Sequence, residues 1–198
     1  AVGQVRDFVR PKGFASVSWQ PTENWDFALR LERQVGQLDF GDFASSVNLN
    51  NEAGQQQVGN PEIVPEQSWD VDLEANGGLG AYGAVRISLY ARDISDVNDN
   101  ILFARVIEDD GSISIDEGPG NLDSAEVYGM DLSGTLELEP LGFAGAKVDW
   151  NAGLREASIV DQVTGEERSL NNQTTRYYNF RFRQDVPNTD WAWGFGYR

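Results

Sequence analysis

The 198-residue sequence contains neither cysteine nor histidine. Without cysteine the chain has no disulfides and no thiolate metal sites, and without histidine it lacks the commonest general base and metal ligand. Nucleophile motifs such as Gly-x-Ser-x-Gly are also missing, so an enzyme is the least supported class and no cofactor is expected. No run of eighteen apolar residues occurs, which excludes a membrane-spanning helix but leaves a β-barrel open, because barrel strands alternate apolar and polar residues.

Basic residues are scarce in three polar segments, at 35–67, 93–126 and 156–173. These segments hold 19 acidic and 2 basic residues, whereas the rest of the chain holds 13 of each sign. The whole net charge of −17 therefore lies in the three segments. Proteins that bind nucleic acid carry basic patches, so this pattern argues against a nucleic-acid partner.

A strict two-residue period runs through the segment 60–92. Residues 69–75 alternate apolar with polar, mostly acidic side chains, and residues 83–92 alternate apolar with polar or aromatic ones. A period of two indicates strands with one apolar and one polar face. The intervening Asn76-Gly77-Gly78 accepts positive φ and predicts a tight hairpin turn.

The same alternation recurs along the rest of the chain, whose length fits one domain. About eight strands are predicted, at 14–20, 25–33, 69–75, 83–92, 125–138, 146–155, 175–186 and 191–197. Four short turns alternate with three long loops, an arrangement that indicates an antiparallel meander. The second long loop contains a small hairpin of its own, with arms at 101–107 and 112–115 and a turn at 109–111.

A soluble β-sandwich and a membrane barrel both produce this alternation. Three features favour the barrel: short and long connections alternate strictly, full charges stand at mid-strand on the polar face alone, and large aromatics cluster beside the short turns. Those aromatics are Trp19, Trp25, Phe143, Trp191 and Trp193. The soluble alternative is a carbohydrate-binding sandwich that uses the last two tryptophans.

Four short motifs resemble, in order and spacing, those of TonB-dependent outer-membrane receptors. Gly59-Asn60-Pro61-Glu62, followed by Pro65-Glu66-Gln67-Ser68-Trp69, resembles the family's "GNP-x-L-x-PE-x-S-x" entry to a barrel strand. Residues 90–97 resemble an "F-x-R-x-I-x-D-x-I" strand end, and residues 120–132 a "GN-x-x-x-A-x-x-x-G-x-E-L" strand. Residues 161–168 resemble a "DP-x-TG-x-x-R" loop in which Gln162 replaces the usual proline.

The resemblance implies an all-β fold, an antiparallel transmembrane β-barrel segment with short periplasmic turns and long extracellular loops. Because the family's barrels have 22 strands and a plugged lumen, residues 1–198 are expected to be a single segment of a larger barrel. Eight strands are also enough to close a small passive outer-membrane barrel, which is the alternative.

The resemblance also implies a function and a place in the cell. The expected location is the outer membrane of a Gram-negative bacterium, and the expected function is energised uptake of a scarce nutrient such as a siderophore or oligosaccharide. The implied partners are outer-membrane lipid and lipopolysaccharide, a small nutrient ligand, and the plug domain and TonB complex through the rest of the chain.

Charged residues on the polar face form the candidate lumen surface. By strand parity they are Arg30, Asp72, Arg86, Arg92, Asp131, Asp149, Arg155, Arg181 and Arg183. They either line a substrate path, dock the plug, or pair with opposite charges across neighbouring strands in a wet interior. The residues predicted to face lipid on the other side are Leu29, Val71, Ile87, Leu132, Val148 and Phe180.

Acidic residues of the second long loop are candidates for a divalent cation site, since hard cations prefer oxygen ligands. The candidates are Asp93, Asp96 and Asp99. Asp96 begins a run that matches the first three ligand positions of a calcium loop, but Ile101 and Ile107 occupy the positions of its glycine and bidentate glutamate. The alternative is a solvated acidic loop without a metal.

Overall fold

The computed structural model describes residues 8–38, 48–50, 55–57, 60–107, 113–161, 164–170 and 174–198. One curved sheet contains eight main strands in the order β1-β2-β5-β6-β7-β8-β10-β11, each antiparallel to its neighbour. Their bounds are β1 (Gly13–Thr22), β2 (Trp25–Val35), β5 (Gln67–Gly78), β6 (Gly83–Ile107), β7 (Ile113–Glu137), β8 (Ala146–Val160), β10 (Arg176–Asp185) and β11 (Ala192–Tyr197). The predicted eight-strand meander is confirmed.

The large apolar side chains of this sheet remain exposed. Leu29, Val71 and Leu89 are exposed by 40%, 41% and 42%, and the described residues form no second sheet that covers them. A sandwich buries such a face between two sheets, so the structure does not support the sandwich. The described residues contain no helix long and apolar enough to cross a membrane.

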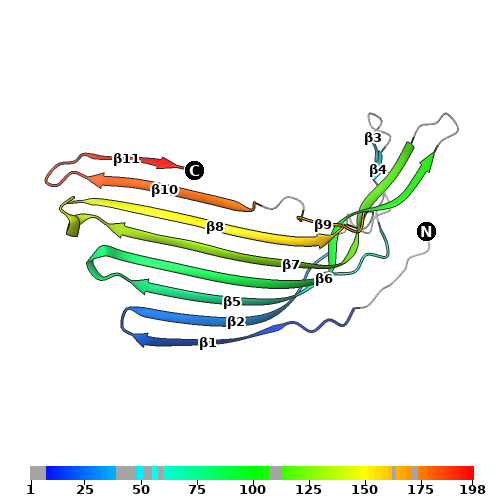
Figure 1. Cartoon of the computed structure of the whole chain (residues 1–198), viewed down its shortest axis with the longest axis horizontal. Helices are drawn as coiled ribbons and strands as arrows, with labels where there is room; N and C mark the ends of the chain where they lie inside the picture. The colour runs from blue at the N-terminus through cyan, green and yellow to red at the C-terminus, as the bar shows by residue number, and fades with distance from the viewer. Residues whose placement is uncertain are drawn as a thin grey trace.

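The four short connections lie together at one end of the sheet, on the left in Figure 1. Two of them contain single 3-10 turns, η1 (Gly80–Tyr82) and η2 (Glu139–Leu141), and the second ends at Gly142 in the left-handed conformation. The three long connections lie at the opposite end. We call these the short-turn end and the long-loop end; their separation confirms the predicted alternation.

The turn between β5 and β6 lies three residues later than predicted. Residues 76–78 stay in β5 and pair with β6, and the chain reverses over 79–82. The side-chain amide of Asn76 holds this extension of the strand, because it donates hydrogen bonds to Asp26 and Glu74 at 3.1 and 2.7 Å. The prediction of a turn at Asn76-Gly77-Gly78 was therefore wrong.

The second long loop is largely a continuation of the sheet. The β6–β7 ladder extends past Arg92 as far as the pair Ile107 and Ile113, so the small hairpin is confirmed but a loop across 93–126 was wrong. Alternation marks a strand only where one face is apolar, and that contrast fades over residues 93–100 and 116–124. The predicted turn at 109–111 lies outside the described residues.

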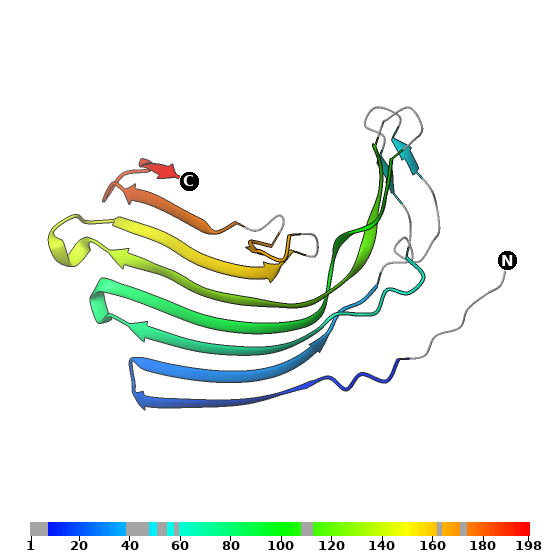
Figure 2. The same cartoon turned by 45° about the vertical axis from the view of Figure 1, so that its right-hand side comes forward.

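The extension leaves the sheet as an arm, seen rising at the right of Figure 2. Two short strands, β3 (Asn48–Asn50) and β4 (Gln55–Gln57), pair with each other, and β4 runs parallel to residues 115–117 of β7. A further short strand, β9 (Glu167–Arg168), pairs with the end of β8. The long-loop end therefore carries β-structure of its own.

A small apolar core lies at the base of the arm. Val97, Leu122, Ala125 and Ile159 are buried there, and Leu170 packs against them from the segment after β9. This core includes the long-loop end of β8, which continues to Val160 rather than ending at the predicted 155. This core marks the boundary between the eight-strand sheet, which we call the wall, and the long-loop end.

Candidate functional site

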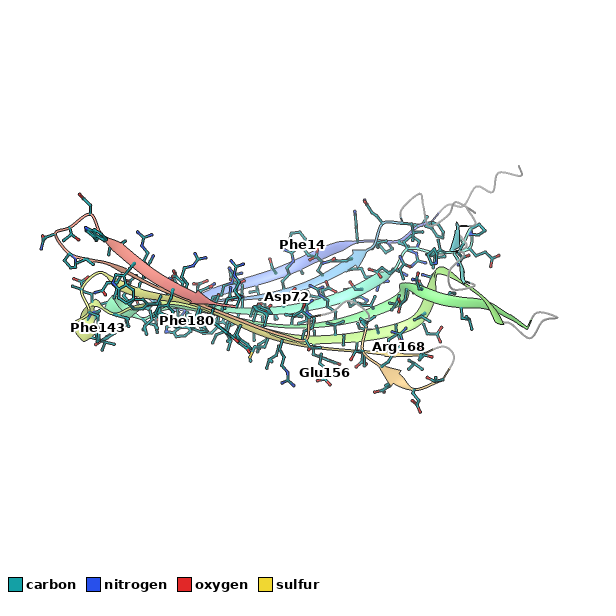
Figure 3. The ribbon with its side chains drawn as sticks, turned by 90° about the horizontal axis from the view of Figure 1, so that it is seen from above. Phe14, Asp72, Phe143, Glu156, Arg168 and Phe180 are labelled. Carbon is teal, nitrogen blue, oxygen red and sulfur yellow. The ribbon has the colours of Figure 1, made fainter. Side chains whose placement is uncertain are left out.

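One face of the wall is apolar from strand to strand because the register aligns the apolar positions. Leu29 lies opposite Leu73, Leu73 opposite Leu89, and Leu89 opposite Met130, which in turn lies opposite Leu154. All six residues predicted to face lipid share this face by the same register. In Figure 3 its members Phe180 and Glu156 lie on the convex side of the sheet, whereas Phe14 and Asp72 lie on the concave side. We call these the outer and inner faces.

The apolar band on the outer face runs obliquely to the strands. Toward the long-loop end, the first polar residue of the outer face beyond the band is Arg33 on β2 and Arg176 on β10. Following the register from Arg176 across the sheet leads to Leu29, four residues before Arg33, over five strand-to-strand steps. At about 3.3 Å per residue and about 4.8 Å between strands, this slant corresponds to strands tilted by about 30° from the normal of the band.

The same slant appears at the short-turn end. Trp19 of β1 aligns through the register with Tyr178 of β10, whereas Trp193 of β11 lies opposite Gln184, six residues further on. Taken between these end strands, both edges of the band give a tilt of about 30°, which is below the ~35–45° of membrane barrels. On β6 and β7 the polar edge is reached at Asp93 and Glu126, level with Arg33 in the register. On β7 the apolar run 128–136 covers about 26 Å along the strand, or about 23 Å along the normal, near the ~25 Å of an outer-membrane apolar band.

Aromatic side chains gather on the outer face near the short-turn end. Trp19 and Trp25 both stack on Phe27, with ring centroids 5.2 and 6.0 Å apart. Trp191 and Phe143 are among the most exposed large side chains, at 78% and 61%. Amphipathic rings in such a position are typical of a membrane–water interface.

All nine candidate lumen residues lie on the inner face, because each aligns with the others or with polar neighbours through the register. Four form ion pairs: Arg30 with Glu32 at 2.9 Å, Arg86 with Glu74, Arg92 with Asp70 at 3.6 Å, and Arg183 with Asp185 at 2.8 Å. Two of these pairs lie within one strand and two cross to the next. The predicted pairing of charges in the interior is thus present for these four residues.

Three further candidates are held by hydroxyl groups instead of opposite charges. Thr135 donates to Asp149 at 2.7 Å, Tyr177 donates to Asp131 at 2.6 Å, and Arg155 donates through Nε to the Tyr90 hydroxyl at 2.8 Å. The remaining two, Asp72 and Arg181, form no ion pair or hydrogen bond with a described residue. The inner face is therefore a nearly continuous polar network.

Two glycines allow the two tyrosines of this network to extend across a neighbouring strand. Tyr90 lies opposite Gly129, and Tyr177 lies opposite Gly153. A Cβ atom at either glycine would overlap the tyrosine ring beside it, so each ring crosses a neighbouring strand at a position without a side chain. As a result, Tyr90 of β6 bonds Arg155 of β8, and Tyr177 of β10 bonds Asp131 of β7.

The three candidate metal ligands are not brought together. Asp96 pairs with Arg10 at 2.8 Å, Asp99 pairs with Arg168 at 2.9 Å, and Asp93 lies on the outer face opposite Glu126. Within the part of the chain that the structure describes, no group of three acidic residues is arranged to hold a metal ion. Asp96 and Asp99 serve instead as partners of arginines.

Arg168 is the clearest of these arginine contacts. Its guanidinium joins Asp99 of the arm to Asp161 at the end of β8, the latter at 3.0 Å. The hydrogen bond to Asp99 is the main influence that raises the pKa of Arg168, with desolvation opposing it. Arg10 acts similarly on the other side, because it also donates to the carbonyl of Pro65 at 2.8 Å. Together the two arginines tie the base of the arm to both flanking segments.

Comparison with known proteins by sequence gives no result: no family model matches the chain, and no curated protein matches it. Comparison by structure finds similar proteins. The copper transporter OprC superposes with a TM-score of 0.65 at 16% identity, over 93% of this chain and 25% of that one. The siderophore receptor PirA from Acinetobacter baumannii gives 0.61 at 15% identity, over 89% and 27%.

A third similar structure is a variant of the ferric enterobactin receptor PfeA from Pseudomonas aeruginosa, with a TM-score of 0.54 at 13% identity, over 87% of this chain and 32% of that one. The fold is that of part of a TonB-dependent receptor barrel. This chain spans about a quarter to a third of the length of those receptors. The sheet is open, with β1 and β11 as its two edges.

Sequence reasoning missed one notable residue of this wall. Asp70 is 2% exposed, and its Oδ1 atom has no hydrogen-bond partner. It shares the inner face with Asp72, two residues away on β5, so the same parity would have placed it in the lumen set. Its burial could not have been foreseen, because it depends on segments distant in sequence.

Proposed function

We propose that this chain forms part of the wall of a TonB-dependent receptor in the outer membrane of a Gram-negative bacterium, and that the complete protein takes up a scarce nutrient such as a siderophore or an oligosaccharide. The observation that carries the proposal is the slanted apolar band on the outer face. Taken between its end strands, the band gives a strand tilt of about 30° and a height of about 23 Å, near the values of membrane barrels. The superposition on receptors for copper and siderophores supports the same reading.

Under this proposal residues 1–198 are one segment of a larger barrel. The free edges of β1 and β11 pair with further strands, because an unpaired strand edge cannot lie in lipid. The short-turn end faces the periplasm and the long-loop end faces the outside, as is usual for these barrels. The polar inner face then borders the lumen, where it meets the plug and the nutrient on its path.

Transport by the full-length protein tests the proposal. Cells that express it are starved of iron or of a carbon source, and uptake of labelled ferric siderophores and oligosaccharides is compared in strains with and without TonB. Energised uptake predicts accumulation that requires both the protein and TonB. Equal uptake without TonB would instead favour a small passive barrel, and absence of the protein from the outer-membrane fraction would defeat both readings.

A further inference from the structure

The outer face changes character between the first and the last strands. At mid-height, β5 and β6 present aliphatic side chains such as Leu73, Ile87 and Leu89. Apart from Gln184, which lies opposite Trp193, the last two strands and the turn before β11 present only aromatic ones over the same height. These are Tyr178, Phe180, Phe182, Trp191, Trp193, Phe195 and Tyr197, and we call them the aromatic column.

Six of the seven rings of the aromatic column contact another ring of the column. Tyr178 stacks on Tyr197 with centroids 5.8 Å apart, and Phe195 lies 5.9 and 5.4 Å from Phe180 and Phe182. Phe182 in turn lies 5.0 Å from Trp193. Tyrosines end the column toward the long loops and tryptophans toward the short turns, with phenylalanine between, which is the order that the two interfaces and the apolar centre of a bilayer favour.

Arg176 stands on the outer face directly beyond the tyrosine end of the column. It lies two residues before Tyr178 on β10, opposite Leu154. No ion pair or hydrogen bond joins its side chain to a described residue. Its guanidinium is thus available at the edge of the apolar band.

Arg33, the outer-face arginine at the same edge of β2, is not available in this way. It donates to Gln67 at 2.5 Å and lies over the Trp69 ring at 5.2 Å. Between the two arginines, the outer face at this level carries acidic residues, with Asp93 opposite Glu126. Arg176 is therefore the position on this edge, within the described residues, where an anionic group gains most by charge complementarity.

We propose that the aromatic column and Arg176 bind one anionic lipid of the outer leaflet. Arg176 binds its phosphate, since guanidinium matches phosphate geometry with paired hydrogen bonds. The hydroxyl ends of Tyr178 and Tyr197 lie at headgroup level, and the acyl chains lie along Phe180, Phe182 and Phe195. This inference rests on the proposed function, because it requires that the band faces lipid and that the long loops face outward.

A carboxylate lies near Arg176 on the outer face and provides a second test of the proposal. Glu156 occupies the outer face of β8 two residues beyond Leu154, the partner of Arg176, and no ion pair joins it to Arg176. A bound phosphate would be repelled by this carboxylate. Glu156→Gln should therefore leave lipid binding unchanged or strengthen it, the opposite of what loss of Arg176 does.

Native mass spectrometry of the full-length protein in detergent tests the site with lipid A as the probe and dephosphorylated lipid A as the control. The wild type should retain one lipid A more strongly than its dephosphorylated form. Arg176→Gln should lower the affinity for lipid A by about tenfold and abolish the preference for phosphate. Arg33→Gln is the matched control and should retain the wild-type preference.

The column is tested separately by Phe180→Leu combined with Phe182→Leu, which should weaken retention of both lipids equally. Wild-type retention by Arg176→Gln would overturn the proposal. So would a photo-crosslinking residue at position 180 that captures another protein in the membrane and no lipid. All variants should insert normally into neutral phosphatidylcholine vesicles; failure of the wild type to insert would count against the proposed function itself, whereas insertion without phosphate preference defeats only the lipid site.

Discussion

The outer and inner faces of the wall share every strand and every backbone hydrogen bond, yet their side chains behave in opposite ways. On the outer face, Leu29, Val71 and Leu89 are about two-fifths exposed, and the described residues form no ion pair at mid-height. On the inner face, arginines, carboxylates and tyrosines bond one another from β2 to β10. The same backbone thus presents one surface suited to lipid and one suited to water, and exposure alone would not have distinguished them.

The largest difference between the faces is expected from a charge placed at mid-height. Ile87 points outward and Ser88 inward on the same strand. Ile87→Arg should destabilise the full-length protein in lipid vesicles by about 2–4 kcal/mol, the cost of arginine on the lipid face at the midplane. Ser88→Arg should cost less than about 1 kcal/mol because the inner face is already polar and charged. Denaturant titration in vesicles measures both, and equal costs would show that the faces do not differ in solvent.

A second effect concerns the tyrosine that crosses Gly129. Gly129→Ala should destabilise the wall by about 1–3 kcal/mol, since its Cβ overlaps the Tyr90 ring and the ring must leave Arg155. Gly13→Ala is the matched control, because nothing lies within 4 Å of a Cβ added there.

A double-mutant cycle identifies the cause of that loss. If the clash with Tyr90 is responsible, Gly129→Ala combined with Tyr90→Ser should cost clearly less than the sum of the two single changes. Additive costs would mean that Gly129 matters for a reason other than the ring.

The third prediction moves from the wall to the long-loop end. Arg168→Ala should remove the ion-pair partner that Asp99 and Asp161 share, at a cost of roughly 1 kcal/mol for a partly exposed pair of charged hydrogen bonds. Hydrogen exchange should become faster around residues 97–101, at the base of the arm, and remain unchanged in β1 and β2. Unchanged exchange at the base of the arm would show that the apolar core there holds it without the arginine.

The smallest effect is expected from an exposed ion pair on the inner face. Glu32→Gln removes the partner of Arg30, whose side chain is 43% exposed. The stability change should lie within about 0–1 kcal/mol and shrink further in high salt. A loss as large as that of Ile87→Arg would mean that the inner face is dry, contrary to a water-filled lumen.

The division into two faces could be predicted from the sequence because it needs only strand parity. Once Leu73 and Leu89 were placed on one face, hydrogen-bonded pairing aligned their neighbours without further information. Parity also placed Arg181 and Asp149 correctly on one face of the sheet, since the two lie opposite each other on neighbouring strands.

Features that depend on contacts between distant segments could not be predicted. Asn76 looked like a turn residue, but its amide bonds Asp26, fifty residues earlier, and keeps the chain in the strand. The candidate metal ligands Asp96 and Asp99 were judged from their spacing, whereas Arg10 and Arg168 approach them from elsewhere in the chain. The spacing of acidic residues along one loop does not indicate which arginine from another segment will pair with them.

Spin labels along β6 test most directly whether the outer face contacts lipid. Single cysteines at positions 85–91 can be introduced into a chain that has none of its own, and the labelled full-length protein is reconstituted in bilayers. Accessibility to dissolved oxygen, which concentrates in lipid, should peak at Val85, Ile87, Leu89 and Ala91 and fall at the three residues between them. Low oxygen accessibility at all seven positions, or peaks in the opposite phase, would contradict a lipid-facing outer wall.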